Sequence, residues 1–124
     1  MENNLTVVVY IKNEILYGRC SGAPILDLSS AKLLLKTIKN VSDKKPYPVI
    51  IDFDGIKYMD KETREFFFKK SAESFSLLAF VTKDFKFKML LNSATSIHLP
   101  HLLFKVFDTS KKAEVWVKQF TSKK

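Results

Sequence analysis

The spacing of hydrophobic positions changes several times along the chain, and each change marks the boundary of a predicted element. Near the start, Leu5, Val7, Val9 and Ile11 recur at every second position. This period places them on one face of an extended strand. A turn at Lys12 and Asn13 would lead into a second strand over residues 14–20. The first twenty residues therefore predict a β-hairpin.

After the hairpin, apolar residues at helical spacing alternate with short, continuous apolar runs. The runs Val49–Phe53, Leu77–Val81 and Leu103–Phe107 are typical of strands, and the first two of strands covered on both faces. Helical spacing predicts helices over 28–42 and 61–73, from Phe87 to Ile97, and from Ala113 to Phe120. The order is ββαβαβαβα. It favours an α/β fold with a mixed central sheet and helices packed on it, as one domain over residues 1–124.

Composition agrees with a single folded domain and adds an expectation about location. The chain has 124 residues, of which 46% are hydrophobic, and it contains eleven Phe. The single cysteine, Cys20, has no partner for an internal disulfide, and the first residues lack the pattern of a signal peptide. The longest apolar runs are about five residues, whereas a membrane span needs roughly 20. We therefore expect a cytoplasmic protein with no transmembrane segment.

The chain is basic, with 21 Lys and Arg against 13 Asp and Glu and a net charge of +8. Such a charge could attract nucleic acid, anionic lipid or an acidic protein. The lysines are scattered along the elements and alternate with acids on the predicted helices. We therefore interpret most of them as a solvated surface, expect no specific nucleic-acid site, and keep weak polyanion binding as an alternative.

The stretch Val49–Thr63, with the sequence VIIDFDGIKYMDKET, carries the most informative motif. It resembles the core of the STAS family, whose domains occur in sulfate transporters and anti-sigma-factor antagonists. In that family an apolar strand containing Asp and followed by Gly leads through an apolar turn to an Asp-Ser motif at a helix start. The order of elements also resembles the family over nearly the whole chain. The resemblance implies a STAS-like, non-enzymatic interaction or regulatory module.

In the bacterial antagonists of this family, phosphorylation of a serine at the helix start controls docking to a kinase-like partner. Asp60 matches the Asp of that motif, but Lys61 and Glu62 stand at the serine positions and Thr63 replaces the glycine. We therefore expect no phosphate control in this chain. Asp60 and Glu62 have a simpler interpretation as residues that cap the helix and complement its dipole.

The run Phe66–Phe68 lies on the same predicted helix. Three consecutive helical positions span about 200°, so they cannot all face one narrow core stripe. Either the helix is wide-faced and covered by the helix over 28–42, or an outward Phe joins Tyr58 and an exposed Met59 in a contact surface. The second hypothesis predicts binding to a protein partner, or to a second copy in a homodimer. Its residues are Tyr58, Asp60, Lys61, Glu62, Thr63, Phe66, Phe67 and Phe68.

Other chemical sites have weaker support in the sequence. Asp52, Asp54 and Asp60 could hold Mg²⁺ or accept a phosphoryl group, as in response-regulator receivers. A receiver also needs an acidic pair after its first strand and a lysine after its last, and neither is present. His98 and His101 have no Cys or Glu nearby in sequence to complete a metal site, and Cys20 has no local base to activate it. We expect no metal, no cofactor and no catalytic residues.

One further alternative belongs to a different functional class. Related folds carry lipids or other small apolar ligands, and the loop Ile97–Leu103, with the helix before it, is apolar enough to gate a pocket. An internal cavity of several hundred Å³ would favour this alternative over the interaction module.

Overall fold

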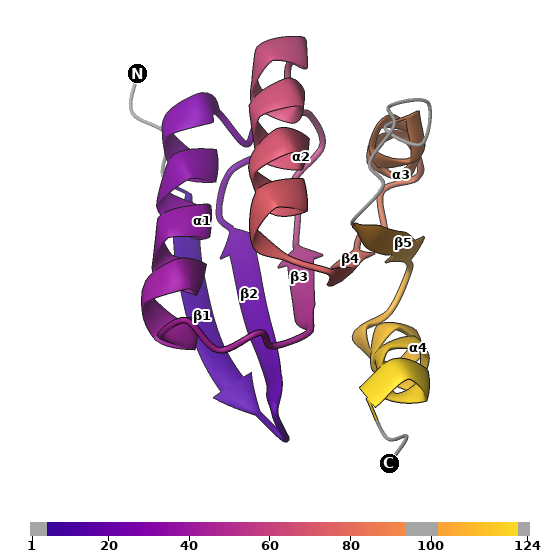
Figure 1. Cartoon of the computed structure of the whole chain (residues 1–124). Helices are drawn as coiled ribbons and strands as arrows, with labels where there is room; N and C mark the ends of the chain where they lie inside the picture. The colour runs from indigo at the N-terminus through magenta and orange to yellow at the C-terminus, as the bar shows by residue number, and fades with distance from the viewer. Residues whose placement is uncertain (1–4, 94–101, 122–124) are drawn as a thin grey trace.

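The computed structural model describes residues 5–93 and 102–121 and shows the predicted ββαβαβαβα order (Figure 1). The hairpin consists of β1 (Thr6–Lys12) and β2 (Ile15–Ser21), which pair antiparallel with Lys12 opposite Ile15. The two residues between the strands, Asn13 and Glu14, have φ angles of 53° and 63°. Two successive left-handed residues are characteristic of a type I′ turn, which matches the twist of the strands. The turn therefore lies one residue later than the sequence predicted.

Replacing Glu14 by glycine is expected to raise the free energy of unfolding by about 0.5–1 kcal/mol. Glycine adopts positive φ without the steric cost that a glutamate pays, and Asn-Gly is a preferred pair for this turn. Chemical denaturation of wild type and Glu14→Gly measures the difference. Glu14→Ala is the control, since it removes the same side chain but keeps a Cβ; an equal gain in both variants would contradict the assignment of the gain to φ.

The five strands form one mixed sheet in the order β1-β2-β3-β4-β5. Strands β3 (Val49–Phe53), β4 (Leu77–Val81) and β5 (Leu103–Phe107) run parallel to β2 and to one another. The carboxyl ends of four strands therefore meet at one edge of the sheet. The predicted α/β architecture with a mixed sheet is confirmed.

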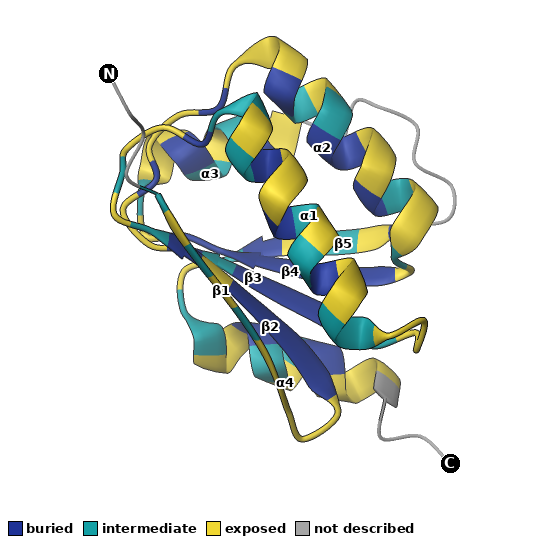
Figure 2. Cartoon of the chain, turned by 90° about the vertical axis from the view of Figure 1, so that its left-hand side faces the viewer, coloured by how far each residue is buried: buried dark blue, intermediate teal, exposed yellow. Residues whose placement is uncertain are grey.

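Helices cover both faces of this sheet. Figure 2 shows α1 (Leu28–Ser42), α2 (Lys61–Ser74) and α3 (Phe85–Asn92) on one face and α4 (Ser110–Thr121) on the other. An aspartate caps each of the first three helices by accepting a hydrogen bond from a backbone N–H three residues further on. Helix α3 begins two residues before the predicted start, and the predicted continuation from residue 94 onward lies outside the described residues.

A cluster of phenylalanine rings fills the space between the sheet and the first three helices. Phe53, Phe67, Phe68, Phe80 and Phe87 are all at most 1% exposed, with neighbouring ring centroids 5.3–6.1 Å apart. Edge-to-face pairs of this kind stabilise a core beyond the burial of their area. Much of the unusual phenylalanine content therefore serves the core.

A smaller apolar cluster lies beneath α4, where Ala113 and Val117 pack against Ile50, Ala79 and their neighbours. Helix α4 lies over β3, β4 and β5. Tyr17 stacks on Tyr10 of β1 with centroids 5.1 Å apart, and its hydroxyl donates to Glu114 of α4. Within residues 5–93 and 102–121, none of the helices has the length and hydrophobicity that a membrane span requires.

Candidate functional site

Two loops that follow neighbouring strands are joined at the carboxyl edge of the sheet. The loop after β2 and the loop after β3 form a short parallel bridge between Ile25 and Tyr58. The Leu26 N–H donates to the Tyr58 carbonyl at 3.0 Å, and the Lys57 and Tyr58 N–H groups donate to the Pro24 carbonyl at 2.7 and 3.1 Å. Bridge partners lie side by side, so this pairing places the side chains of Ile25 and Tyr58 together. Each is 49% exposed.

The first turn of α2 adjoins this pair. Asp60 Oδ1 accepts a hydrogen bond from the Thr63 N–H at 2.8 Å, which caps the helix. This backbone hydrogen bond, aided by the Thr63 hydroxyl, lowers the pKa of Asp60. The predicted capping role of Asp60 is confirmed. The side chains of Lys61 and Glu62 are exposed, whereas Thr63 is only 1% exposed.

Because the pKa of Asp60 is lower in the folded state, its ionised form stabilises the fold at neutral pH. This stabilisation is lost as the pH falls through the folded-state pKa. Asp60→Ala is therefore expected to destabilise the protein at pH 7, and the difference from wild type should shrink at pH 3. Urea unfolding at both pH values measures it. Asp60→Asn keeps a hydrogen-bond acceptor at the cap but removes the charge. The difference in the free energy of unfolding between this variant and wild type should therefore depend on pH. A pH-independent loss in Asp60→Ala would contradict the ionised cap.

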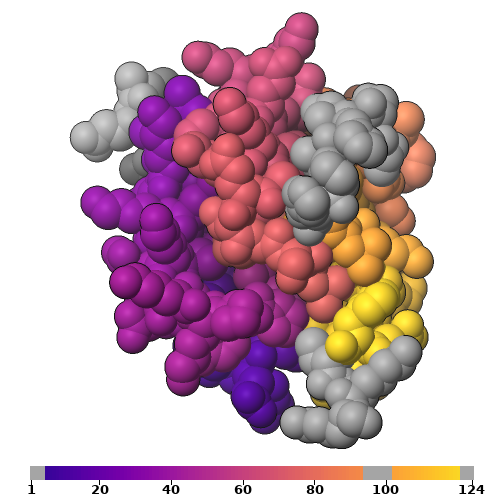
Figure 3. Space-filling view, viewed as in Figure 1, coloured from indigo at the N-terminus to yellow at the C-terminus, as the bar shows by residue number. Residues whose placement is uncertain are grey.

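The phenylalanine run is directed mainly inward. Phe67 and Phe68 belong to the core, and Phe66 is half-buried with the Lys32 ammonium of α1 5.5 Å from its ring centroid. Figure 3 shows the side chains of α1 and α2 meeting on the front of the molecule. The expected exposure of Met59 is wrong: it is 0% exposed. Its side chain packs in the core cluster beneath the helices, so it cannot contribute to a surface patch.

The structure thus divides the eight residues predicted for partner binding. Tyr58, Asp60, Lys61 and Glu62 lie exposed in one stretch, Phe66 is partly covered, and the remaining three are buried: Thr63, Phe67 and Phe68. Sequence reasoning missed Ile25. An apolar residue between Pro24 and the capping Asp27 was the available signal, but its pairing with Tyr58 depends on the tertiary structure.

A pocket of about 540 Å³ opens at the carboxyl ends of β3, β4 and β5. Charged side chains contribute much of its lining, among them Arg19, Asp52, Asp54, Lys57 and Lys83. Arg19 and Asp54 form an ion pair at 2.6 Å. Burial raises the pKa of Asp52, and the Asp54 charge adds to the rise, while Arg19 and Lys83 oppose it.

The described residues hold no group of three or more His, Cys, Asp or Glu side chains arranged to bind a metal ion. Cys20 is buried in β2, and burial raises the pKa of its thiol to about 12, so the thiol stays protonated and unreactive near neutral pH. This confirms the interpretation of Cys20 as an ordinary buried thiol. His98, His101 and most of the loop Ile97–Leu103 lie outside the described residues.

Comparison with known proteins identifies the fold and the family. The chain is similar to a solved structure of an uncharacterised protein of the DUF3478 family from Shewanella loihica PV-4, described as having a SpoIIAA-like fold. The two share 13% sequence identity with a TM-score of 0.63, over 94% of this chain and 96% of the other. None of the curated proteins matches this chain. A family model described as a domain of unknown function, DUF7793, matches residues 9–121. The chain has a STAS-like fold. Because the family model matches most of its length, the chain is a member of the DUF7793 family.

Proposed function

We propose that this protein is a non-catalytic interaction module that binds a protein partner through the Ile25–Tyr58 surface. We define this surface as Ile25 and Tyr58 together with the capping residue Asp60 and the exposed first-turn residues Lys61 and Glu62 of α2. The observation that carries the proposal is the bridge that holds two half-exposed apolar side chains side by side. An adjacent apolar pair with a charged rim is the usual anatomy of a protein contact.

The rim of this surface carries charges of both signs. Lys57 and Lys61 are exposed beside Asp60 and Glu62, so a partner with a mixed charge pattern would fit it. Phosphorylation of the first turn is not part of the proposed mechanism. Lys61 and Glu62 cannot accept a phosphate as a serine does, and the Thr63 side chain is buried. Docking is therefore proposed to be constitutive.

Affinity capture from native cells tests the proposal. The wild-type protein and an Ile25→Glu/Tyr58→Glu variant serve as baits, and Val115→Glu is the matched control because Val115 is 56% exposed on α4. A partner retained by wild type and by the control but lost from the double variant supports the proposal. A partner retained equally by all three would contradict it. If the partner is a second copy of the chain, sedimentation of the wild type alone will show a dimer that the double variant lacks.

The pocket favours a second candidate, the binding of a small polar ligand. Its volume lies within the range of about 300–1,000 Å³ typical of ligand sites. The charged lining suits a polar molecule better than the lipid that the fold resemblance suggested. Native mass spectrometry of the purified protein tests this candidate. A bound metabolite that is released by Arg19→Ala, a change at the pocket wall, would support it.

A further inference from the structure

Helix α3 carries two large hydrophobic side chains that point away from the core. Phe85 and Met89 are 72% and 58% exposed, the two largest values among the large hydrophobic side chains in the described part of the chain. They lie four residues apart, so they occupy the same side of the helix. Phe87 and Leu91 of the same helix are both 0% exposed. We call Phe85 and Met89 the α3 crest.

Lysines flank the crest on both sides. Successive helical positions turn by about 100°, so Lys86 follows Phe85 around one side of the helix and Lys88 precedes Met89 around the other. No acidic residue occurs within α3 itself. The crest therefore lies between positive charges that belong to its own helix.

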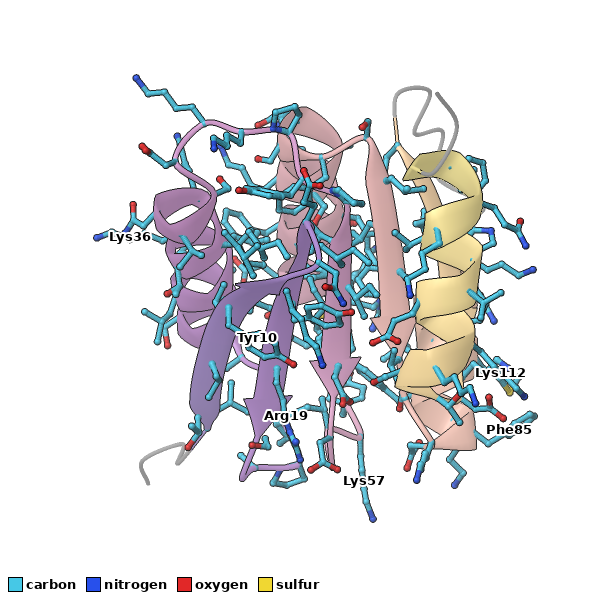
Figure 4. The ribbon with its side chains drawn as sticks, turned by 90° about the horizontal axis from the view of Figure 1, so that it is seen from below. Tyr10, Arg19, Lys36, Lys57, Phe85 and Lys112 are labelled. Carbon is cyan, nitrogen blue, oxygen red and sulfur yellow. The ribbon has the colours of Figure 1, made fainter. Side chains whose placement is uncertain are left out.

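The beginning of α4 adds basic charge at the same corner. Figure 4 shows Phe85 and Lys112 at one outer corner of the molecule. Lys112 pairs with Asp108 at 3.1 Å, and Lys112 and, more weakly, Lys88 lower the pKa of that carboxyl. The carboxylate of Asp84, at the start of α3, accepts a hydrogen bond from the Phe87 N–H at 2.8 Å. Lys86 and Lys88 of α3 and Lys112 of α4 outnumber these two acids.

We propose that the α3 crest docks on the surface of a membrane that contains anionic lipids. An aromatic and a methionine side chain insert at the boundary between headgroups and acyl chains, while the flanking lysines contact the lipid phosphates. Two projecting apolar side chains are sufficient for weak, reversible membrane attachment, because basic residues near an anionic surface add to the insertion of apolar groups. The crest and the Ile25–Tyr58 surface share no residue, so the membrane proposal is independent of the proposed function.

Co-sedimentation with vesicles tests the proposal. Vesicles of phosphatidylcholine alone are compared with vesicles that also contain phosphatidylserine. We expect the wild-type protein to bind the anionic vesicles, to release from them as salt is raised, and to remain free of the neutral ones. Binding to neither kind of vesicle at low salt would overturn the proposal.

Substitution of the crest separates insertion from general attraction of a basic protein, because it leaves the net charge of +8 unchanged. Phe85→Ser/Met89→Ser and Lys86→Glu/Lys88→Glu should each reduce the partition coefficient by about tenfold or more. Leu33→Ser is the control, since Leu33 is 53% exposed on α1, and it should bind as wild type does. Circular dichroism checks that each variant is folded. Vesicle binding that is insensitive to the two crest substitutions would show attraction by net charge alone and would overturn the insertion of α3.

A fluorescence measurement reports insertion directly. In Phe85→Trp, the new indole should shift its emission to shorter wavelength when anionic vesicles are added. Wild type is the control, because its Trp116 packs against Phe107 and Phe120 with ring centroids 5.6 and 5.3 Å away. The absence of a shift in Phe85→Trp while the protein is bound would contradict insertion. Binding of the crest to a soluble acidic protein, with no binding to vesicles, would assign the surface to a protein partner and overturn the membrane proposal.

Discussion

Replacing Phe67 by alanine is expected to lower the free energy of unfolding by about 3–5 kcal/mol. The Phe67 ring is 0% exposed and lies 6.1 Å from the Phe53 ring, 5.7 Å from Phe68 and 5.8 Å from Phe80. Alanine would remove the contacts to three rings and leave a cavity that the packed sheet can close only in part. Since a domain of this size is stable by about 5–15 kcal/mol, the substitution would remove a large part of the stability.

Urea denaturation followed by circular dichroism measures this loss, and Phe66→Ala is the matched control. Phe66 belongs to the same helix and loses the same atoms, but its ring is half-buried beneath the Lys32 side chain. We expect the control to lose much less stability than Phe67→Ala. Equal losses at both positions would contradict the observed orientation of α2.

Truncating both Ile25 and Tyr58 to alanine is expected to weaken binding of the captured partner by about 2–4 kcal/mol, or roughly 30- to 1,000-fold in Kd. Most of the change should occur in the dissociation rate, since truncation removes packed contacts and leaves long-range attraction unchanged. The fold should survive, because both side chains are half-exposed and the bridge between their loops consists of backbone hydrogen bonds.

Surface plasmon resonance with the purified partner measures this effect. Val115→Ala is the control, since it shortens a similarly exposed side chain on α4, on the opposite face of the sheet from α2. The assignment would be contradicted if the double variant bound with unchanged affinity and Phe66→Ala bound more weakly. The contact surface would then lie at the phenylalanine run.

The order of elements was predictable from the sequence because it depends on local periodicity and punctuation. Strands β3, β4 and β5 have the predicted bounds, and α2 ends one residue later than predicted. The cap at Asp60 was also predictable, since an acceptor just before a helical stretch satisfies free backbone N–H groups wherever the helix packs. The hairpin turn lies one residue later than predicted, because the neighbouring polar pairs Lys12-Asn13 and Asn13-Glu14 suit a turn equally well.

The tertiary structure decided which side chains are exposed on the surface. Helical spacing shows that three consecutive phenylalanines cannot share a narrow stripe, but it does not show what lies on either side of the helix. Because α2 packs beside α1 on the same face of the sheet, Phe67 and Phe68 reach the core, and Phe66 meets Lys32. Likewise, Ile25 and Tyr58 are far apart in sequence and become neighbours only because β2 and β3 are parallel and end at the same edge. Local pattern thus determined which elements form, whereas packing between elements determined which side chains remain for a partner.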